Sequence, residues 1–493
     1  MTAIQPLRHL IIFLPGIMGS ELRKDGKPVW ALSGVPVWQY IAALRLALGG
    51  SLNALALHDD DWQKDDLGDG IVASNVLNDL HGVPAIVQSA GYSEILKAIP
   101  RAFIGVVQGD IAHPQAHQNF FPFPYDWRRD NRATARKLQQ FIERQLPRWR
   151  ESSGASDAQV ILIGHSMGGL VARYYMEALG GWTHTIGLIT IGTPHRGALN
   201  AVDALGNGVK KLGIDMTAVA RSLTSLYQLL PIYECIQVDG DFTRPADTDR
   251  LPNIDRARAR AAREEFHMAI RAAAFANRQQ SGYQLRTIPW VGTRQDTPQS
   301  AFLAGAGVAL SYGPPTGLDA ALADGDGTVP RVSAIPSDFS DVEAATLPRF
   351  AAEQHGWLTN NAMTLTPLLA TITQMTVPGA QALLAGPVPA RAALSLRVEP
   401  LIARDEPLEA TVTLRDTSAP AGVELTLQPV EPARRRTSQE AIVVPGVPAT
   451  LRFEGLPPGL YHVQLRARGR IKGAPTPVNS MVEIADATAD EMG

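Results

Sequence analysis

A serine in a short glycine-flanked motif is the first residue whose setting indicates chemistry. Ser166 stands in the sequence GHSMG at residues 164–168, directly after the apolar run 160–163 and before a helical pattern at residues 167–179. A sharp turn from a strand into a helix lifts a serine hydroxyl out of the sheet, and small residues on both sides fit its crowded backbone. This context predicts a nucleophile elbow with Ser166 as the attacking residue.

The predicted nucleophile needs a general base. A serine hydroxyl is a weak nucleophile near neutral pH, so a histidine must take its proton, and in folds with this elbow the histidine comes last of the three partners. The histidines after the serine are His184, His195, His267, His355 and His462. We predict His355 as the base because it lies in a loop that enters a helix, and we keep His195 as the alternative.

The base in turn needs a carboxylate that orients its ring. Asp326 follows a strand-like run and stands between two glycines, in a turn that can direct its carboxylate toward a histidine. Asp324 is the nearest alternative. Glu353 is too close in sequence to His355 to approach it, so Asp326 is the predicted acid.

The oxyanion formed by serine attack needs two backbone N–H donors. In an elbow of this type one donor comes from the residue after the nucleophile, here Met167, and the other from the loop after the first strand. That loop is the segment 15–20, and we assign the second donor to Ile17.

The strands and helices that must position these residues alternate along the chain. Short runs that are apolar on both faces occur at residues 10–14, 160–163, 186–191 and 285–291. Helical patterns separate them, which is typical of a mostly parallel sheet covered by helices on both faces. We predict an α/β fold, with a catalytic domain over residues 1–378 that closes with a helix at about 357–375 and carries insertions at about 23–90 and 200–285.

The pattern of apolar and polar residues changes after the predicted catalytic domain. From about residue 392 to residue 487, apolar and polar residues alternate in short runs separated by turn residues. Period-two strands at this spacing predict a small all-β sandwich. Its role is open, and a protein partner bound through this domain is one possibility.

Composition limits the partners and cofactors. Lys and Arg number 45 and Asp and Glu 48, for a net charge of −3, so the chain lacks the basic surface expected of a nucleic-acid-binding protein. One cysteine, Cys235, excludes a disulfide framework and a cysteine-built metal site. The acidic residues at 59–69 do not follow EF-hand spacing and predict a solvated loop. We therefore expect no cofactor and no metal.

Membrane and export signals are weak in the sequence. No apolar run reaches the ~18 residues that a membrane-spanning helix needs, and residues 1–10 lack the features of a secretory signal. We expect no transmembrane segment and a cytoplasmic location, with signal-independent export as the alternative.

Six motifs together resemble a known family. They are LPGIMGSEL at 14–22, PYDWR at 124–128, GHSMGG at 164–169, GTP at 192–194, GDGTV at 325–329 and His355. Over about residues 8–375 the chain resembles the lecithin:cholesterol acyltransferase family of α/β-hydrolases, which also contains phospholipases A and phospholipid:diacylglycerol acyltransferases. The resemblance implies an α/β-hydrolase fold, insertions that act as a lid and membrane-contacting parts, and a triad and oxyanion donors at Ser166, Asp326, His355, Ile17 and Met167.

These features lead to one functional hypothesis and two alternatives. The hypothesis is a serine-dependent lipid acyl hydrolase or acyltransferase that acts on phospholipid or other lipid esters, at a membrane surface, through an acyl-enzyme intermediate. The alternatives are a soluble carboxylesterase or amidase that acts on non-lipid acyl groups, and a non-catalytic binding scaffold.

Overall fold

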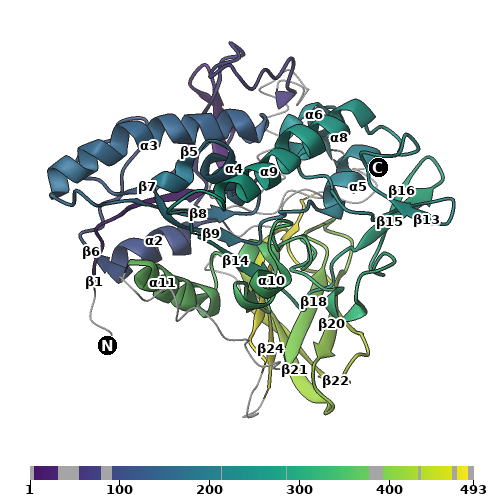
Figure 1. The fold of residues 1–493 in the computed structure, drawn as a ribbon. Coiled ribbons are helices and arrows are strands. Elements are labelled where there is room, and N and C mark those ends of the chain that lie inside the picture. Colours follow the sequence, from purple (N-terminus) through teal and green to yellow (C-terminus); the bar gives the residue numbers. More distant parts are fainter. Residues whose placement is uncertain are drawn as a thin grey trace.

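The fold was analysed in a computed structural model, which describes residues 5–31, 55–78, 91–211, 214–284, 286–376, 392–430, 435–468 and 475–486 (Figure 1). Of the predicted insertion at about 23–90, residues 32–54 and 79–90 lie outside these ranges.

A six-stranded parallel sheet forms the centre of the α/β part, in the order β17-β14-β9-β8-β2-β7. Its strands are β2 (Leu10–Leu14), β7 (Phe120–Pro122), β8 (Val160–His165), β9 (Thr185–Ile191), β14 (Thr287–Gly292) and β17 (Arg349–Ala351). The four strands predicted from apolar runs are the four central ones. The prediction of an α/β fold is confirmed.

Helices cover both faces of this sheet (Figure 1). They are α3 (Asn131–Ser153) and α4 (Met167–Ala178) on one face, and α2 (Ser93–Ala102) and α11 (Ala362–Thr376) on the other. Successive side chains of a strand point to opposite faces. In β2, Leu10 and Ile12 pack in the core with α3 and α4, whereas Ile11 and Phe13 pack with α2 and α11. The continuous apolar runs in the sequence therefore reflect burial on both faces.

A largely helical insertion follows β9. Its elements are α5 (Leu199–Gly206), β10 (Lys210–Lys211), β11 (Ile214–Asp215), α6 (Thr217–Ser222), α7 (Thr224–Tyr227), β12 (Ile236–Val238), β13 (Asp241–Thr243), α8 (Arg256–Ala261), the π-helix η3 (Ala262–His267) and α9 (Met268–Asn277). Strands β12 and β13 join β15 (Ser300–Ala304) and β16 (Gly307–Ser311) in a second sheet of order β13-β12-β15-β16. The sequence pattern did not indicate this sheet, because strands of three to five residues are too short to show a clear period.

Smaller elements complete the α/β part. They are β1 (Gln5–Pro6), β3 (Ser20–Lys24), β4 (Lys27–Trp30), β5 (Ile71–Val76), β6 (Phe103–Ile104), η2 (Gly181–Thr183), η4 (Ala320–Leu322), α10 (Asp341–Thr346) and η5 (His355–Trp357). The described helix near the end of this part begins at Ala362, because a 3-10 turn occupies the residues where the sequence predicted its start.

Two antiparallel sheets form the C-terminal β part. One contains β18 (Ala393–Val398), β20 (Leu408–Arg415) and β23 (Ala449–Phe453), and the other contains β19 (Leu401–Ile402), β21 (Ala421–Pro429), β22 (Thr437–Val443), β24 (Gly459–Ala467) and β25 (Val478–Ile484). Apolar side chains from both sheets share one core, so the predicted sandwich is confirmed. Among the described strands of this part, the short β19–β25 pairing is parallel and the others are antiparallel.

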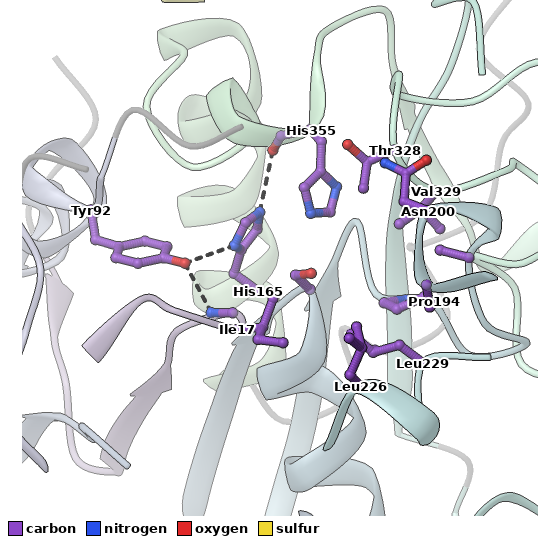
Figure 2. A pocket seen from close by; sticks show the side chains of 14 residues that line it. Ile17, Tyr92, His165, Pro194, Asn200, Leu226, Leu229, Thr328, Val329 and His355 are labelled. Carbon is purple, nitrogen blue, oxygen red and sulfur yellow. Dashed lines mark hydrogen bonds between the residues drawn. The ribbon is translucent and has the colours of Figure 1, made fainter. Parts of the chain in front are cut away.

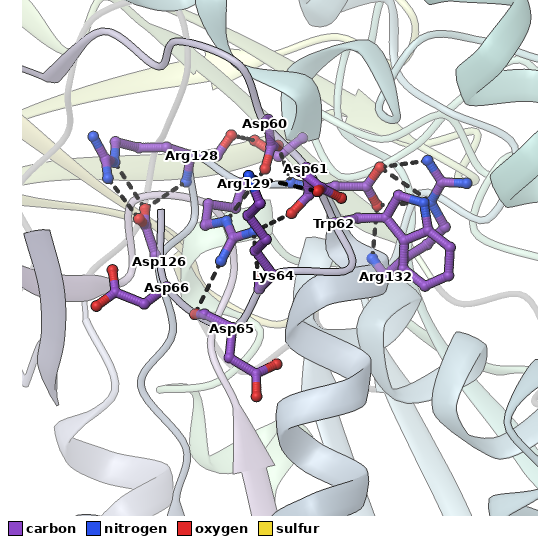
Figure 3. Close-up of polar contacts among 12 residues, drawn as sticks. Asp60, Asp61, Trp62, Lys64, Asp65, Asp66, Asp126, Arg128, Arg129 and Arg132 are labelled. Carbon is purple, nitrogen blue, oxygen red and sulfur yellow. Dashed lines mark hydrogen bonds and ion pairs between the residues drawn. The ribbon is translucent and has the colours of Figure 1, made fainter. Parts of the chain in front are cut away.

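The acidic segment at residues 59–69 is solvated in part, as predicted, because Asp59, Asp65 and Asp66 are exposed, but it is also anchored to the protein (Figure 3). Arg128 is fully buried and pairs with Asp126 at 2.6 Å and Asp69 at 2.8 Å. Arg129 pairs with Asp60, whose side chain is only 5% exposed. These arginines come directly before α3, so they tie the acidic segment to the helix.

Candidate active site

Ser166 occupies a strained turn between β8 and α4. Its φ of 51° and ψ of −126° lie in a region that residues with a side chain rarely adopt. The flanking glycines are required by close packing, because a Cβ atom on Gly164 would lie 2.5 Å from Gly169 Cα, and one on Gly168 would lie 2.3 Å from the Pro15 carbonyl oxygen. The turn therefore packs against the loop after β2, which carries Ile17.

His355 and Asp326 are brought into direct contact. The His355 Nδ1 lies 2.7 Å from Asp326 Oδ2, and the backbone N–H of His355 donates to the Asp326 carbonyl oxygen. The other carboxylate oxygen accepts from the backbone N–H groups of Thr328 and Val329 at 3.0 and 2.7 Å. Because a carboxylate only accepts hydrogen bonds, the His355 Nδ1 that contacts it must carry a proton. The other ring nitrogen, Nε2, is then the acceptor.

The alternative base and acid lie elsewhere. His195 Nε2 lies 3.1 Å from the Thr190 hydroxyl, and burial lowers the pKa of this histidine well below its usual value. Asp324 accepts from the Arg294 backbone N–H and forms ion pairs with Arg294 and Arg331. Neither residue lines the pocket that contains Ser166.

Ser166 and His355 line the same pocket, together with Ile17 (Figure 2). Among the described side chains no hydrogen bond joins the Ser166 hydroxyl to the His355 ring. Catalytic hydrogen bonds are often long before substrate binds. Ser166, His355 and the loop after β2 therefore surround the same small pocket.

Four aromatic side chains fix the loop that carries Ile17. The Tyr92 hydroxyl accepts from the Gly16 N–H at 2.8 Å, and Tyr125 donates to the Pro15 carbonyl at 2.8 Å. The indole N–H groups of Trp30 and Trp127 donate to the carbonyls of Met18 and Ser20 at 3.0 and 3.2 Å. Two of these residues belong to the PYDWR motif, whose contribution to the site is to hold this loop.

The two predicted oxyanion donors remain available. Among the described contacts, the Ile17 backbone N–H has no protein acceptor, and Met167 begins α4, where the first amide groups have no acceptor within the helix. The partial positive charge at a helix N-terminus also favours an anion beside Met167. The site can therefore accept negative charge near Ser166.

His165 and Tyr92 belong to the site, although the sequence assigned them no role. His165 Nε2 lies 3.2 Å from the His355 carbonyl oxygen, and its Nδ1 lies 3.0 Å from the Tyr92 hydroxyl (Figure 2). Burial, together with the neighbouring His355, lowers the pKa of His165 well below its usual value, so its ring is neutral. Its position inside the elbow motif was a signal for such a role, but the partner, 73 residues away, was not visible in the sequence.

The rest of the pocket wall is mostly apolar, with Asn200 and Thr328 as its polar residues. Leu226 and Leu229 come from the insertion after β9, and Val329 follows the Asp326 turn. The pocket measures about 40 Å³, far below the roughly 300–1,000 Å³ of most ligand sites. In this arrangement it holds a few water molecules at most.

The described residues contain neither a metal centre nor a membrane-spanning helix. No three His, Cys, Asp or Glu side chains among them come together as a metal centre requires. No described helix combines the length and apolar character needed to span a bilayer.

Comparison with known proteins gives a family match for part of the chain, which includes Ser166 and Met167. The family model described as lecithin:cholesterol acyltransferase matches residues 114–269, a segment that includes the PYDWR and GHSMGG motifs. No curated protein sequence matches the chain.

Similar solved structures include the lipase BlEst2 of Bacillus licheniformis in two forms. The mature form has 12% sequence identity and a TM-score of 0.30, with 76% of this chain and 96% of that chain covered. The propeptide form has 11% identity and a TM-score of 0.28, with 98% and 96% covered. The predicted resemblance is confirmed by the family match: residues 114–269 match the lecithin:cholesterol acyltransferase family, within a chain that has an α/β-hydrolase fold followed by a β-sandwich.

Proposed function

We propose that this protein is a serine-dependent lipid acyl hydrolase or acyltransferase. The family match supports chemistry on lipid esters. The observation that carries the serine mechanism is the 2.7 Å contact of His355 with Asp326 at a pocket shared with the strained Ser166. We assign these three residues as base, acid and nucleophile, in a catalytic domain over residues 1–378.

The reaction proceeds in two steps. His355 Nε2 takes the proton of the Ser166 hydroxyl as Oγ bonds to the ester carbonyl carbon, and the carbonyl oxygen, now an anion, accepts from the Ile17 and Met167 amides. When the tetrahedral intermediate collapses, His355 returns the proton to the departing alcohol and an acyl-enzyme remains. Water or a lipid alcohol then attacks the acyl carbon while His355 takes the attacking group's proton. The bond between Ser166 Oγ and the acyl carbon breaks, His355 gives the proton to Oγ, and the fatty acid or new ester leaves.

The mostly apolar pocket wall favours a fatty acyl chain over a polar acyl group. The pocket is too small for such a chain as it stands, so we infer that the insertion residues Leu226 and Leu229 move away when lipid enters. Phospholipid is the leading substrate class, met at a membrane surface.

A comparison of the wild type with Ser166→Ala tests this proposal. A fluorophosphonate reacts with an activated serine, so the wild type should be labelled once per chain and the variant not at all. Mixed phospholipid vesicles incubated with the wild type should yield free fatty acid or a new acyl ester, and the variant should yield neither.

The same experiment separates the alternatives. Equal labelling of both proteins, or labelling of neither, contradicts the serine mechanism. A labelled wild type that cleaves short soluble esters and leaves the vesicles intact indicates an esterase for non-lipid acyl groups. Quantification of the lipid products also reports the bond cleaved and the acyl acceptor.

A further inference from the structure

The C-terminal β-sandwich contacts the segment that carries His355. Gln354 donates from Nε2 to the Leu396 carbonyl of β18 at 2.6 Å. Gln295, which follows β14, exchanges two hydrogen bonds with the same strand, at the Leu394 carbonyl and the Leu396 N–H. The sandwich is therefore hydrogen-bonded to the α/β part beside the predicted base.

Glu353 is the centre of this contact. Its side chain is buried and accepts four hydrogen bonds, two at each carboxylate oxygen. Oε1 accepts from the backbone N–H groups of Gln354 at 2.9 Å and Asn479 at 3.0 Å. Oε2 accepts from the side-chain amides of Asn361 at 2.5 Å and Asn479 at 2.9 Å. All four donors are neutral, and among the described residues no lysine or arginine forms an ion pair with Glu353. Two of the four bonds come from Asn479, in β25 of the sandwich.

The sandwich also contacts the chain on the C-terminal side of His355. The Asn479 side-chain oxygen accepts from His462 Nε2 at 3.1 Å and from Gln464 Nε2 at 3.0 Å, both in β24. The His462 ring stacks on Trp357, with centroids 4.6 Å apart and an interplanar angle of 23°. Glu353 precedes His355 by two residues and Trp357 follows it by two. Asn479 and His462 are hydrogen-bonded to each other, and together they contact the chain on both sides of His355: Asn479 at Glu353 and His462 at Trp357.

We propose that the β-sandwich is a working part of the active site, in which Glu353, Asn479 and His462 act as positioning residues that hold His355 against Asp326. This inference rests on the proposed role of His355 as general base. It assigns the sandwich a function within the chain itself. None of the three residues lines the pocket, so their effect on the reaction is exerted through His355.

Glu353→Gln tests the proposal because it keeps the shape of the side chain while it changes the hydrogen bonding and removes the ionisable carboxyl group. A glutamine presents one oxygen and one NH₂ group, so two of the four donors would then face another donor. The Asn479 amide cannot turn over to compensate, because its oxygen is already bound by His462 and Gln464. We expect the rate constant for fluorophosphonate labelling to fall about 10- to 100-fold, as expected when a reacting group is displaced.

Glu424→Gln is the matched control. Glu424 lies in β21 of the same sandwich and pairs with Arg466 near the surface, with no contact to the His355 segment. The same chemical change there should leave the labelling rate unchanged. Circular dichroism and thermal unfolding of each variant establish that it is folded.

The pH profile separates positioning from a general loss of structure. Burial raises the pKa of Glu353 to about 7, against the effect of its four donors. The groups that face it from the turn before α11, from β25 and from its own loop are amides. The next titratable group along these hydrogen bonds is His462 of β24, whose pKa burial lowers. On the acid side, the logarithm of the wild-type labelling rate should rise with pH more steeply than that of Glu353→Gln, by a slope of up to about one, for the proton that Glu353 loses.

His462→Phe is a second variant for the case in which Glu353→Gln does not fold. It keeps an aromatic ring to stack on Trp357 and removes only the N–H donor to Asn479, so we expect a smaller loss of rate. If every folded variant is labelled at the wild-type rate with the wild-type pH profile, the inference is wrong while the serine mechanism stands. If the wild type itself is not labelled, the proposed function has failed instead.

Discussion

At the scale of single residues, the hydrogen bonds around His165 allow only one arrangement of protons. The His355 carbonyl can only accept, so His165 donates to it from Nε2, and the unprotonated Nδ1 must accept from the Tyr92 hydroxyl. The Tyr92 oxygen in turn accepts from the Gly16 N–H. Tyr92 thus links the loop that presents Ile17 to the backbone of His355.

Removal of the Tyr92 hydroxyl should therefore affect both stability and activity. In Tyr92→Phe, the Gly16 N–H and His165 Nδ1 lose their partner in a buried site, which costs about 1–3 kcal/mol for each unsatisfied group. We expect a lower free energy of unfolding in urea and a slower rate of fluorophosphonate labelling, because the oxyanion loop is less well fixed.

Tyr174→Phe is the control for this change. Tyr174 is also largely buried, in α4, and its ring stacks on Phe266. Removal of its hydroxyl should leave the labelling rate at the wild-type value. Equal labelling rates in Tyr92→Phe and the wild type would show that the hydroxyl does not support the oxyanion loop.

At the scale of elements, buried ion pairs hold the acidic segment to the start of α3. The hydrogen bond and positive charge of Arg128 lower the pKa of Asp69 despite partial burial, which acts in the opposite direction. The folded-state pKa lies below that of the unfolded chain, so this pair stabilises the fold above about pH 4, and the contribution is lost as the pH falls further. The segment between Asp126 and α3 also supplies the Trp127 indole that bonds the oxyanion loop.

Arg128→Leu should destabilise the protein substantially. The substitution leaves the Asp126 and Asp69 carboxylates without their buried cation, and breaking a buried pair on one side costs roughly 3–5 kcal/mol. Urea unfolding near neutral pH measures the loss. Arg8→Leu breaks the exposed pair with Asp157 and should cost no more than about 1 kcal/mol, so similar losses in the two variants would contradict the assignment.

At the scale of the whole molecule, buried groups whose pKa values shift in opposite directions on folding determine how stability depends on pH. Burial lowers the pKa values of His165 and His195 well below 6.5 and that of His267 to about 4. Their stabilising contribution is present above pH 6.5 and is lost as the pH falls. The pKa of Glu353 is raised from 4.5 to about 7, so its contribution is present below pH 4.5 and is lost as the pH rises through 7.

Acid should therefore destabilise the protein well before the exposed carboxylates are protonated. Near pH 5.5, unfolding lets each of these three histidines take up a proton while Glu353 releases one, so these four groups together give a net uptake of about two protons. The free energy of unfolding should fall by roughly 3 kcal/mol per pH unit on acidification in this range.

Urea unfolding curves at several pH values measure this slope. Glu353→Gln removes a group that acts in the opposite direction, so its stability should fall more steeply with acid than that of the wild type. A free energy of unfolding that stays constant or rises from pH 6.5 to pH 5 would be incompatible with neutral buried histidines.

The sequence by itself determined the features that depend on neighbours along the chain. Runs such as Ile11 to Leu14 are apolar on both faces, which is sufficient to indicate a strand buried in a parallel sheet, and period-two runs after residue 392 indicated the sandwich. The glycines around Ser166 revealed the elbow, because a crowded turn excludes larger residues locally. The motifs also gave the family that matches residues 114–269.

Tertiary structure alone decided which distant groups meet. The contact of His355 with Asp326 could be suggested from chain order, but nothing near Glu353 in sequence points to Asn479, 126 residues away. The Tyr92–His165 bond and the anchoring of the acidic segment by Arg128 and Arg129 were equally hidden. Such contacts join polar residues whose types recur throughout the chain, so no local period or propensity marks the partner, and only the packing of the sheet, helices and sandwich selects it.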